Sequence, residues 1–178
     1  MLNNFEAGKL GEHICMTHLM KLGYSCQIIN LDTVDIVINY QETFLRIQVK
    51  SSILKGRGSG MTRHMGYQFA TSHSGKKKPL TKEHCDIVAF VAIEPERVFF
   101  KPIECLKGQV TKRISPIKFN KDDLERRSLQ YCLDRLFLSN WSYPSYRGVF
   151  TVFFLIRFTN KKTYLLSDIT VLILRHFL

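Results

Sequence analysis

The pattern of apolar and polar positions predicts that the chain begins with a helix. Residues 4–22 carry apolar side chains at helical spacing, Asn3 or Asn4 can cap the first turn, and Gly23 follows the last apolar residue. Glu6 stands in the first turn, where an acidic side chain complements the helix dipole. Start signal, spacing and stop signal agree, and we therefore predict one amphipathic helix over this segment.

Glu12 is unusual because it falls inside the apolar stripe of the predicted helix. That stripe is formed by Phe5, Gly8, Cys15, Met16 and Leu19. A carboxylate buried among such side chains has to be paired or bind a metal. Leu10 and Ile14 widen the apolar face, so a position for Glu12 at the edge of that face is the alternative.

Three strand-like runs follow the helix. They are SCQIIN (25–30), VDIVINY (34–40) and TFLRIQVK (43–50). A tight polar connection joins the last two runs, which predicts a hairpin. With a loop of about four residues, Asp35 lies opposite Gln48, whereas a slip of one residue would turn the faces over. Alternation then places Gln48 and Lys50 on one face of the third strand, beside Asp35.

The rest of the chain completes a mixed α/β domain and adds an extension. In order come two basic, glycine-containing loops (55–66 and 72–79), two strands (85–93 and 97–103) and a helix over 121–137 capped by Asn120. We therefore predict an α/β core over residues 1–138, built as a helix, a three-stranded meander, further strands and a helix. Residues 139–178 are predicted to form an apolar C-terminal extension that serves oligomerisation.

The charge balance adds a class of partner to this picture. The 178-residue chain carries 26 Lys and Arg against 15 Asp and Glu, which gives a formal net charge of +11. An excess of this size favours a polyanionic partner, with nucleic acid first and an anionic membrane surface second. A basic protein that binds neither is the remaining alternative.

Cysteine usage and the N-terminal residues indicate an intracellular protein that is not secreted. The five cysteines form no CxxC pair and no zinc spacing, and they fall in apolar segments, as buried thiols do in a reducing compartment. The N-terminus has no apolar h-region, so we predict no signal peptide. The most apolar run, at 149–156, is too short to span a bilayer, and we predict no membrane partner.

Glu12, Asp35, Gln48 and Lys50 together supply the parts that phosphodiester hydrolysis needs. The reaction uses oxygen ligands to hold Mg²⁺, which polarises the phosphate and lowers the pKa of a bound water, and a cation close to that water. An Asp, an acceptor two residues before a Lys, and a carboxylate on the helix meet this description. Asp32 is an alternative to Asp35, although it lies nearer the turn and outside the apolar run.

The chain resembles the PD-(D/E)XK nuclease superfamily in three segments, which are GKLGE on the predicted helix, VDIVI on the middle strand and IQVKSS on the next. The Q-x-K form in this order is most similar to the branch that contains group I intron homing endonucleases. Holliday junction resolvases share the order but usually carry Glu before the x-K. The resemblance covers roughly residues 5–137 and implies a restriction-endonuclease-like core that uses Mg²⁺.

The resemblance also implies a role for each residue of the motif. Asp35 would be the central metal ligand, Gln48 would bind the metal through its amide oxygen, and Val49 through its backbone carbonyl. Lys50 would position the attacking water, and Glu12 would complete the site. The chain departs from the family pattern in two ways, because no proline precedes the aspartate and Gln replaces the second acid. The loss of that negative charge leaves the number of bound Mg²⁺ ions open.

The sequence therefore predicts a Mg²⁺-dependent, site-specific double-strand DNA endonuclease of the homing type. Because one such site cuts one strand, we expect a homo-oligomer, either a dimer or a tetramer. The alternatives are a Holliday junction resolvase or repair nuclease of the same fold, a DNA-binding protein whose nuclease site has lapsed, and a basic structural protein. The expected contacts to double-stranded DNA are Lys55, Arg57, Arg63, Lys76, Lys77 and Lys78.

Overall fold

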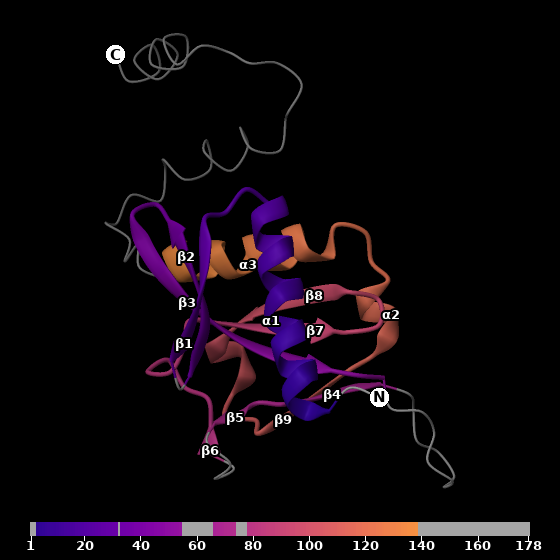
Figure 1. The fold of residues 1–178 in the computed structure, drawn as a ribbon. Coiled ribbons are helices and arrows are strands. Elements are labelled where there is room, and N and C mark those ends of the chain that lie inside the picture. The colour runs from indigo at the N-terminus through magenta and orange to yellow at the C-terminus, as the bar shows by residue number, and fades with distance from the viewer. Residues whose placement is uncertain (1–2, 32, 55–65, 74–77, 139–178) are drawn as a thin grey trace, which may run out of the picture. The chain divides into compact units, whose positions relative to one another are not determined.

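A five-stranded mixed sheet is the centre of the fold. The structure is a computed structural model, which describes residues 3–31, 33–54, 66–73 and 78–138. The sheet order is β1-β2-β3-β7-β8, and two-stranded ribbons pair β4 with β9 and β5 with β6 (Figure 1). The elements are α1 (Asn4–Lys21), β1 (Cys26–Leu31), β2 (Val34–Tyr40), β3 (Thr43–Ser52), β4 (Tyr67–Ala70), β5 (Ser72–His73), β6 (Lys78–Pro79), β7 (Ile87–Ala92), β8 (Arg97–Pro102), η1 (Ile103–Leu106), β9 (Thr111–Ile114), α2 (Pro116–Phe119) and α3 (Leu124–Leu138). This architecture confirms the predicted mixed α/β core.

The first helix begins and ends where its capping residues predict. The Asn3 side chain accepts from the Glu6 amide at 2.9 Å, and the Glu6 carboxylate accepts from the Asn3 amide at 2.8 Å, which closes a capping box. Gly23 follows the helix with a φ of +89°. The predicted apolar stripe is wrong at Phe5, which is 74% exposed. The buried residues of α1 are Ala7, Gly11, Ile14, Cys15 and Leu19.

The β2–β3 hairpin has a shorter loop than predicted and the predicted register. Tyr40 pairs with Thr43, and the two loop residues between them both have positive φ, as tight hairpin turns require. Ile36 pairs with Ile47, so the same register places Asp35 opposite Gln48 one step further on. The predicted hairpin register is therefore confirmed.

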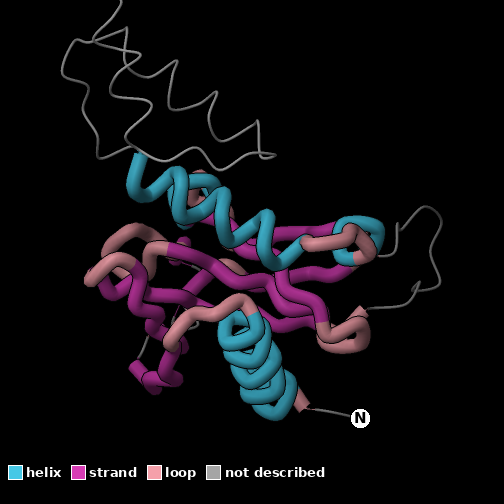
Figure 2. Tube along the Cα trace, turned by 90° about the horizontal axis from the view of Figure 1, so that it is seen from above, coloured by secondary structure: helices cyan, strands magenta, loops and turns pink. Residues whose placement is uncertain are grey.

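Two apolar clusters hold the sheet in place. The first joins Ile14 of α1 and Leu133 of α3 to one set of alternate strand residues, which includes Ile47 and Val49. The second joins the other residues of β7, such as Phe90, to β4, β9 and α2. Figure 2 shows the two long helices beside the strands, and both α1 and α3 pack on this first cluster. β7 lies between β3 and β8 and is buried along its whole length.

The start of the last helix differs from the prediction. Asn120 does not cap it from the N-terminal side, since it is the C-terminal cap of the short helix α2, which begins at Pro116. The chain then turns at Asp123, whose φ is +52° and whose carbonyl accepts from the Arg127 amide at 2.9 Å. Pro at the first helical position is preorganised for a helix start, and Pro116 therefore begins a separate turn of helix before α3.

Several predicted features lie outside the described residues. These are Lys55, Arg57, Arg63, Lys76 and Lys77 of the basic loops, the alternative ligand Asp32, and the extension 139–178. In the described ranges, no helix has the length and hydropathy needed to cross a membrane. The five cysteines are free thiols, and Cys15, Cys85 and Cys132 are buried.

Candidate active site

Asp35, Gln48 and Lys50 meet where β2 begins opposite the second half of β3. Gln48 is buried, with 6% of its surface exposed, and its side-chain amide donates to the Asp35 carboxylate. The same Asp35 oxygen accepts from the Val49 backbone amide at 2.6 Å. Two donors on successive residues of β3 therefore fix the carboxylate against the strand. This contact explains why a strand so apolar carries a glutamine on its polar face.

The oxygen atoms of this site converge on one point, which is occupied by the Gln48 amide nitrogen. That nitrogen donates to Asp35 and also lies 3.3 Å from the Val49 carbonyl oxygen. Carboxylate and carbonyl oxygens only accept, so they fix which end of the amide is the nitrogen. A half-turn of the amide would present its oxygen instead and give three oxygen donors. Magnesium prefers such donors, and the residues present therefore fit a hard divalent cation.

Burial makes the negative charge of Asp35 unfavourable. Desolvation raises the pKa of its carboxyl group, and the nearby Glu12 carboxylate raises it further. The hydrogen bond from Val49 and the charges of Lys50 and Lys9 lower that pKa without offsetting the rise. Two carboxylates in a shielded position, with incomplete compensation by lysines, form a local environment that favours an added cation.

Glu12 lies at the edge of the apolar face of α1, the alternative left open by the sequence. Its side chain is 13% exposed, and both its oxygens accept from the Lys9 ammonium, at 3.2 and 2.9 Å. Gly11 allows α1 to approach β3 closely, because it has no Cβ. A Cβ at this position would lie 2.6 Å from the Ser51 Cβ. The sequence pattern did not single out Lys9, although its spacing of three residues from Glu12 on a helix is typical of an ion pair.

Lys50 extends from β3 on the same side as Gln48. Its ammonium donates to the Ser72 carbonyl at 3.4 Å. Burial lowers the pKa of this lysine, and the attraction of Asp35 and Cys85 opposes the change without cancelling it. A partly desolvated lysine next to a carboxylate is a candidate for orienting water and for exchanging a proton with it.

Two histidine rings lie in contact near the site, which the sequence did not predict. The rings of His73 and His84 have centroids 4.2 Å apart. His73 adjoins Ser72, the residue that accepts from Lys50. Thr33, two residues before Asp35, donates to the His84 carbonyl at 3.4 Å. The spacing of the two histidines along the chain carries no metal-binding signal, because the contact arises only when the β5–β6 ribbon folds back.

The donor set depends on groups other than acids. In the parts of the chain that the structure describes, no group of three or more His, Cys, Asp or Glu side chains has a metal-binding arrangement. The converging donors at Asp35 include a glutamine amide and a backbone carbonyl, which lie outside that set of residue types.

Among the predicted DNA contacts, Lys78 is described, and it is exposed on β6.

Comparison with known proteins adds a family and a fold. The sequence pattern of one family, PD-(D/E)XK endonuclease, matches residues 2–132. The solved structure of a bacterial homing endonuclease, I-Ssp6803I, superposes with a TM-score of 0.53 at 18% sequence identity, over 79% of this chain and 94% of that chain. Identity this low shows a shared fold alone. No curated protein sequence matches the chain.

Proposed function

Since this chain belongs to the PD-(D/E)XK endonuclease family and is a DNA endonuclease, we propose that it cuts both strands of duplex DNA at a specific site in a Mg²⁺-dependent reaction. The observation that carries the proposal is the convergence of the Asp35 carboxylate and the Val49 carbonyl on the Gln48 amide. Lys50 extends from the same strand on the same side. Oxygen ligands for a cation, with a lysine close by, are the parts that metal-assisted phosphodiester hydrolysis uses.

The proposed roles follow from the positions of the groups. Asp35, Gln48 and Val49 would hold the cation through oxygen atoms, and Glu12 would add charge from α1. When bound, Mg²⁺ would supply the positive charge that polarises the scissile phosphate. Lys50 would orient the water that attacks phosphorus. The lowered pKa of its ammonium makes proton exchange at Nζ easier than for an exposed lysine.

The proposed assembly and DNA contacts extend beyond the described residues. The basic loops, including Lys55, Arg57 and Lys76, would contact phosphates on either side of the cleaved bond. Cutting both strands requires two active sites, so we propose a homo-oligomer. The apolar extension 139–178 would supply its interface, as a separate unit following the nuclease core of residues 1–138.

Cleavage of a randomised duplex library with Mg²⁺ tests the proposal. Wild-type protein should cut at one long site, and Lys50→Ala should reduce the cleavage rate by about 10²–10⁴-fold while DNA binding is retained. The matched control is Lys21→Ala, because Lys21 is an exposed lysine in the last turn of α1. Equal cleavage by Lys50→Ala and Lys21→Ala would contradict the role of Lys50. Preferential cutting of four-way junctions, whatever their sequence, would indicate a resolvase instead.

A further inference from the structure

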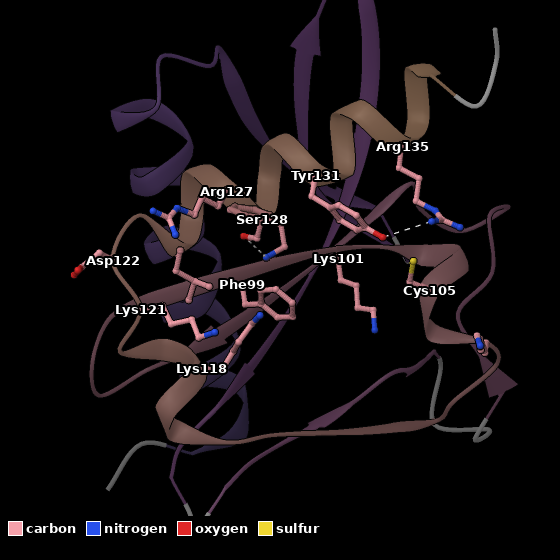
Figure 3. Close-up of a pocket in the computed structure, with 13 residues that line it drawn as sticks. Phe99, Lys101, Cys105, Lys118, Lys121, Asp122, Arg127, Ser128, Tyr131 and Arg135 are labelled. Carbon is pink, nitrogen blue, oxygen red and sulfur yellow. Dashed lines mark hydrogen bonds between the residues drawn. The ribbon is translucent and has the colours of Figure 1, made fainter. Parts of the chain in front are cut away.

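A basic groove lies outside the catalytic site, along β8, which is an edge strand of the sheet (Figure 3). It has a volume of about 660 Å³ and is bounded by β8, α2 and α3. Its basic side chains are Lys101, Lys107, Lys118, Lys121, Arg127 and Arg135, and its acidic side chain is Asp122. These residues come from separate elements, so the fold itself gathers the positive charge.

The positive charge of the groove is only partly balanced by nearby carboxylates. Arg135 lies 4.0 Å from a Glu104 oxygen. Within the described ranges, Lys101, Lys118 and Arg127 have no carboxylate oxygen within 4.0 Å. Burial lowers the pKa of Lys101, and the charges of neighbouring lysines, including Lys118, lower it further. A cluster of positively charged side chains that repel one another favours the binding of an anionic ligand.

The groove lies along the sheet edge at β8, and one of its residues, Phe99, is on the same side of the sheet as Lys50. Lys50 pairs with Phe90 on β7, and Phe90 pairs with Phe99 on β8. The groove residue Phe99 is therefore two strand spacings, about 10 Å, from Lys50 along the sheet. Phe69 of β4 packs on Phe90 between them, with ring centroids 5.0 Å apart. The buried side chains of Phe69 and Phe90 therefore separate the groove from the catalytic residues.

Two aromatic side chains accompany the basic ones. The Lys118 ammonium lies 4.5 Å from the centroid of the Phe99 ring, and Tyr131 is 52% exposed. Lysine and arginine side chains spaced along an open groove suit the repeated negative charges of a phosphodiester backbone.

We propose that this groove binds the phosphodiester backbone of DNA, at a second contact separate from the catalytic site. The proposal rests on the chain being a DNA endonuclease and not on the roles of Gln48 or Lys50. The groove would hold a stretch of duplex beside the cleaved segment and so increase affinity without contacting the reacting phosphate.

The test measures binding of a fluorescent duplex by anisotropy over a range of salt concentrations, in the Lys50→Ala background, where cleavage does not interfere. Lys118→Gln/Arg127→Gln removes two groove charges. Lys21→Gln/Arg126→Gln removes the same charge from exposed positions outside the groove. Each variant replaces one Lys and one Arg by Gln, so the two have the same net charge. Arg126 and Arg127 are neighbours on α3, and the variants therefore differ only in where the charges are removed.

The groove variant should bind less tightly than its control. The slope of log affinity against log salt should fall by about 0.9 for each phosphate that the variant no longer neutralises, and the control should keep the wild-type slope. As a second measurement, bound duplex should protect Lys118 and Lys121 from acetylation, while Lys21 stays reactive. Equal slopes for both variants, or equal acetylation of the groove lysines with and without DNA, would overturn the proposal. Loss of binding to phosphatidylserine vesicles with unchanged DNA binding would overturn it in favour of a lipid surface.

Discussion

The side-chain amide of Gln48 donates to the Asp35 carboxylate across the β2–β3 pair, with the Val49 carbonyl as its second neighbour. The partial positive charge of the amide thus lies among oxygen atoms that would otherwise repel one another. A cation at the same point would stabilise those oxygens more strongly and would favour the opposite orientation of the amide. The identity of residue 48 should therefore set how tightly the site binds a metal.

Replacing Gln48 with Glu tests this relationship. The added charge should tighten Mg²⁺ binding by about tenfold, equivalent to ~1.4 kcal/mol. Without metal, the new carboxylate should repel Asp35 and lower the melting temperature. Calorimetric titration with Mg²⁺ and thermal unfolding with and without Mg²⁺ measure both effects. Gln68→Glu, at an exposed position on β4, is the matched control. Unchanged Mg²⁺ affinity in Gln48→Glu would place the metal elsewhere.

Asp35→Asn should raise the free energy of unfolding at neutral pH while it abolishes cleavage. The pKa of Asp35 is raised in the folded protein, mainly by burial. Because this pKa is raised, the folded protein favours the protonated carboxyl group of Asp35. The stability gained in this way is fully present below the ordinary aspartate pKa of about 3.9 and is lost as the pH rises through the pKa of the folded protein. Asn stays neutral at every pH. Asp35→Asn should therefore be more stable than the wild type above the folded pKa of Asp35, and the difference should vanish below the ordinary aspartate pKa.

Urea denaturation of the wild type and Asp35→Asn at pH 3 to 7 measures this difference. Mg²⁺ should stabilise the wild type, by about 2.7 kcal/mol at a concentration 100 times its dissociation constant, and should leave Asp35→Asn unchanged. Asp122→Asn, at an exposed position outside the catalytic site, should behave as the wild type does. A Mg²⁺ response that persists in Asp35→Asn would contradict the assignment of Asp35 as a ligand.

Gly11 and Gly8 make a matched pair on α1. A Cβ on Gly11 would lie 2.6 Å from the Ser51 Cβ, whereas one on Gly8 would meet nothing within 4 Å. Gly11→Ala should therefore push α1 away from β3, destabilise the fold by about 1–3 kcal/mol, and reduce cleavage by moving Glu12 away from Asp35. Gly8→Ala should stabilise by about 0.5–1 kcal/mol through helix propensity.

Denaturation and single-turnover cleavage of both alanine variants measure these changes. Adding Ser51→Gly to Gly11→Ala removes the clashing Cβ from the other side, and it should restore part of the cleavage rate. If Gly11→Ala were as stable and as active as Gly8→Ala, the close approach of α1 to β3 would have no part in placing Glu12.

The hairpin and its register could be predicted from the sequence because they depend on local order. Alternation over residues 34–40 and 43–50 fixes two strands, and a tight turn between them allows few registers. With the register set, the pairing of Asp35 and Gln48 follows. The first helix was predictable for the same reason, since its capping residues adjoin the segment that they cap.

The contacts that the sequence did not reveal depend on segments that meet only after folding. The contact between the His73 and His84 rings requires the β5–β6 ribbon, whose strands have two residues each and carry no periodic signal. The basic groove joins side chains from β8, α2 and α3 that have no common spacing. Asn120 was misassigned because its residue type suits a cap of either neighbouring helix, and Pro116 decides which.

Glu125 connects α3 to β8 through hydrogen bonds. Replacing it should weaken the packing of α3 on β8 without changing the residues of the candidate active site. Its buried carboxylate accepts from the Arg97 guanidinium at 2.7 and 3.2 Å and from the Val98 backbone amide at 3.0 Å. Burial alone would raise the pKa of Glu125, but the hydrogen bonds from Arg97 and Val98 outweigh it and leave the pKa lowered. Glu125→Gln keeps one acceptor oxygen and leaves Arg97 without its ion pair.

We expect Glu125→Gln to lower the free energy of unfolding at pH 7 by about 1–3 kcal/mol. A lowered carboxyl pKa contributes stability that is present above the ordinary glutamate value, about 4.3, and is lost as pH falls through the folded value. The difference between wild type and Glu125→Gln should therefore shrink below that pH, whereas Glu83→Gln, at an exposed position, should cost little at any pH. Urea denaturation of the three proteins at pH 7 and pH 3 measures this. A difference that does not change with pH would mean that packing, and not the charge on Glu125, holds α3 against β8.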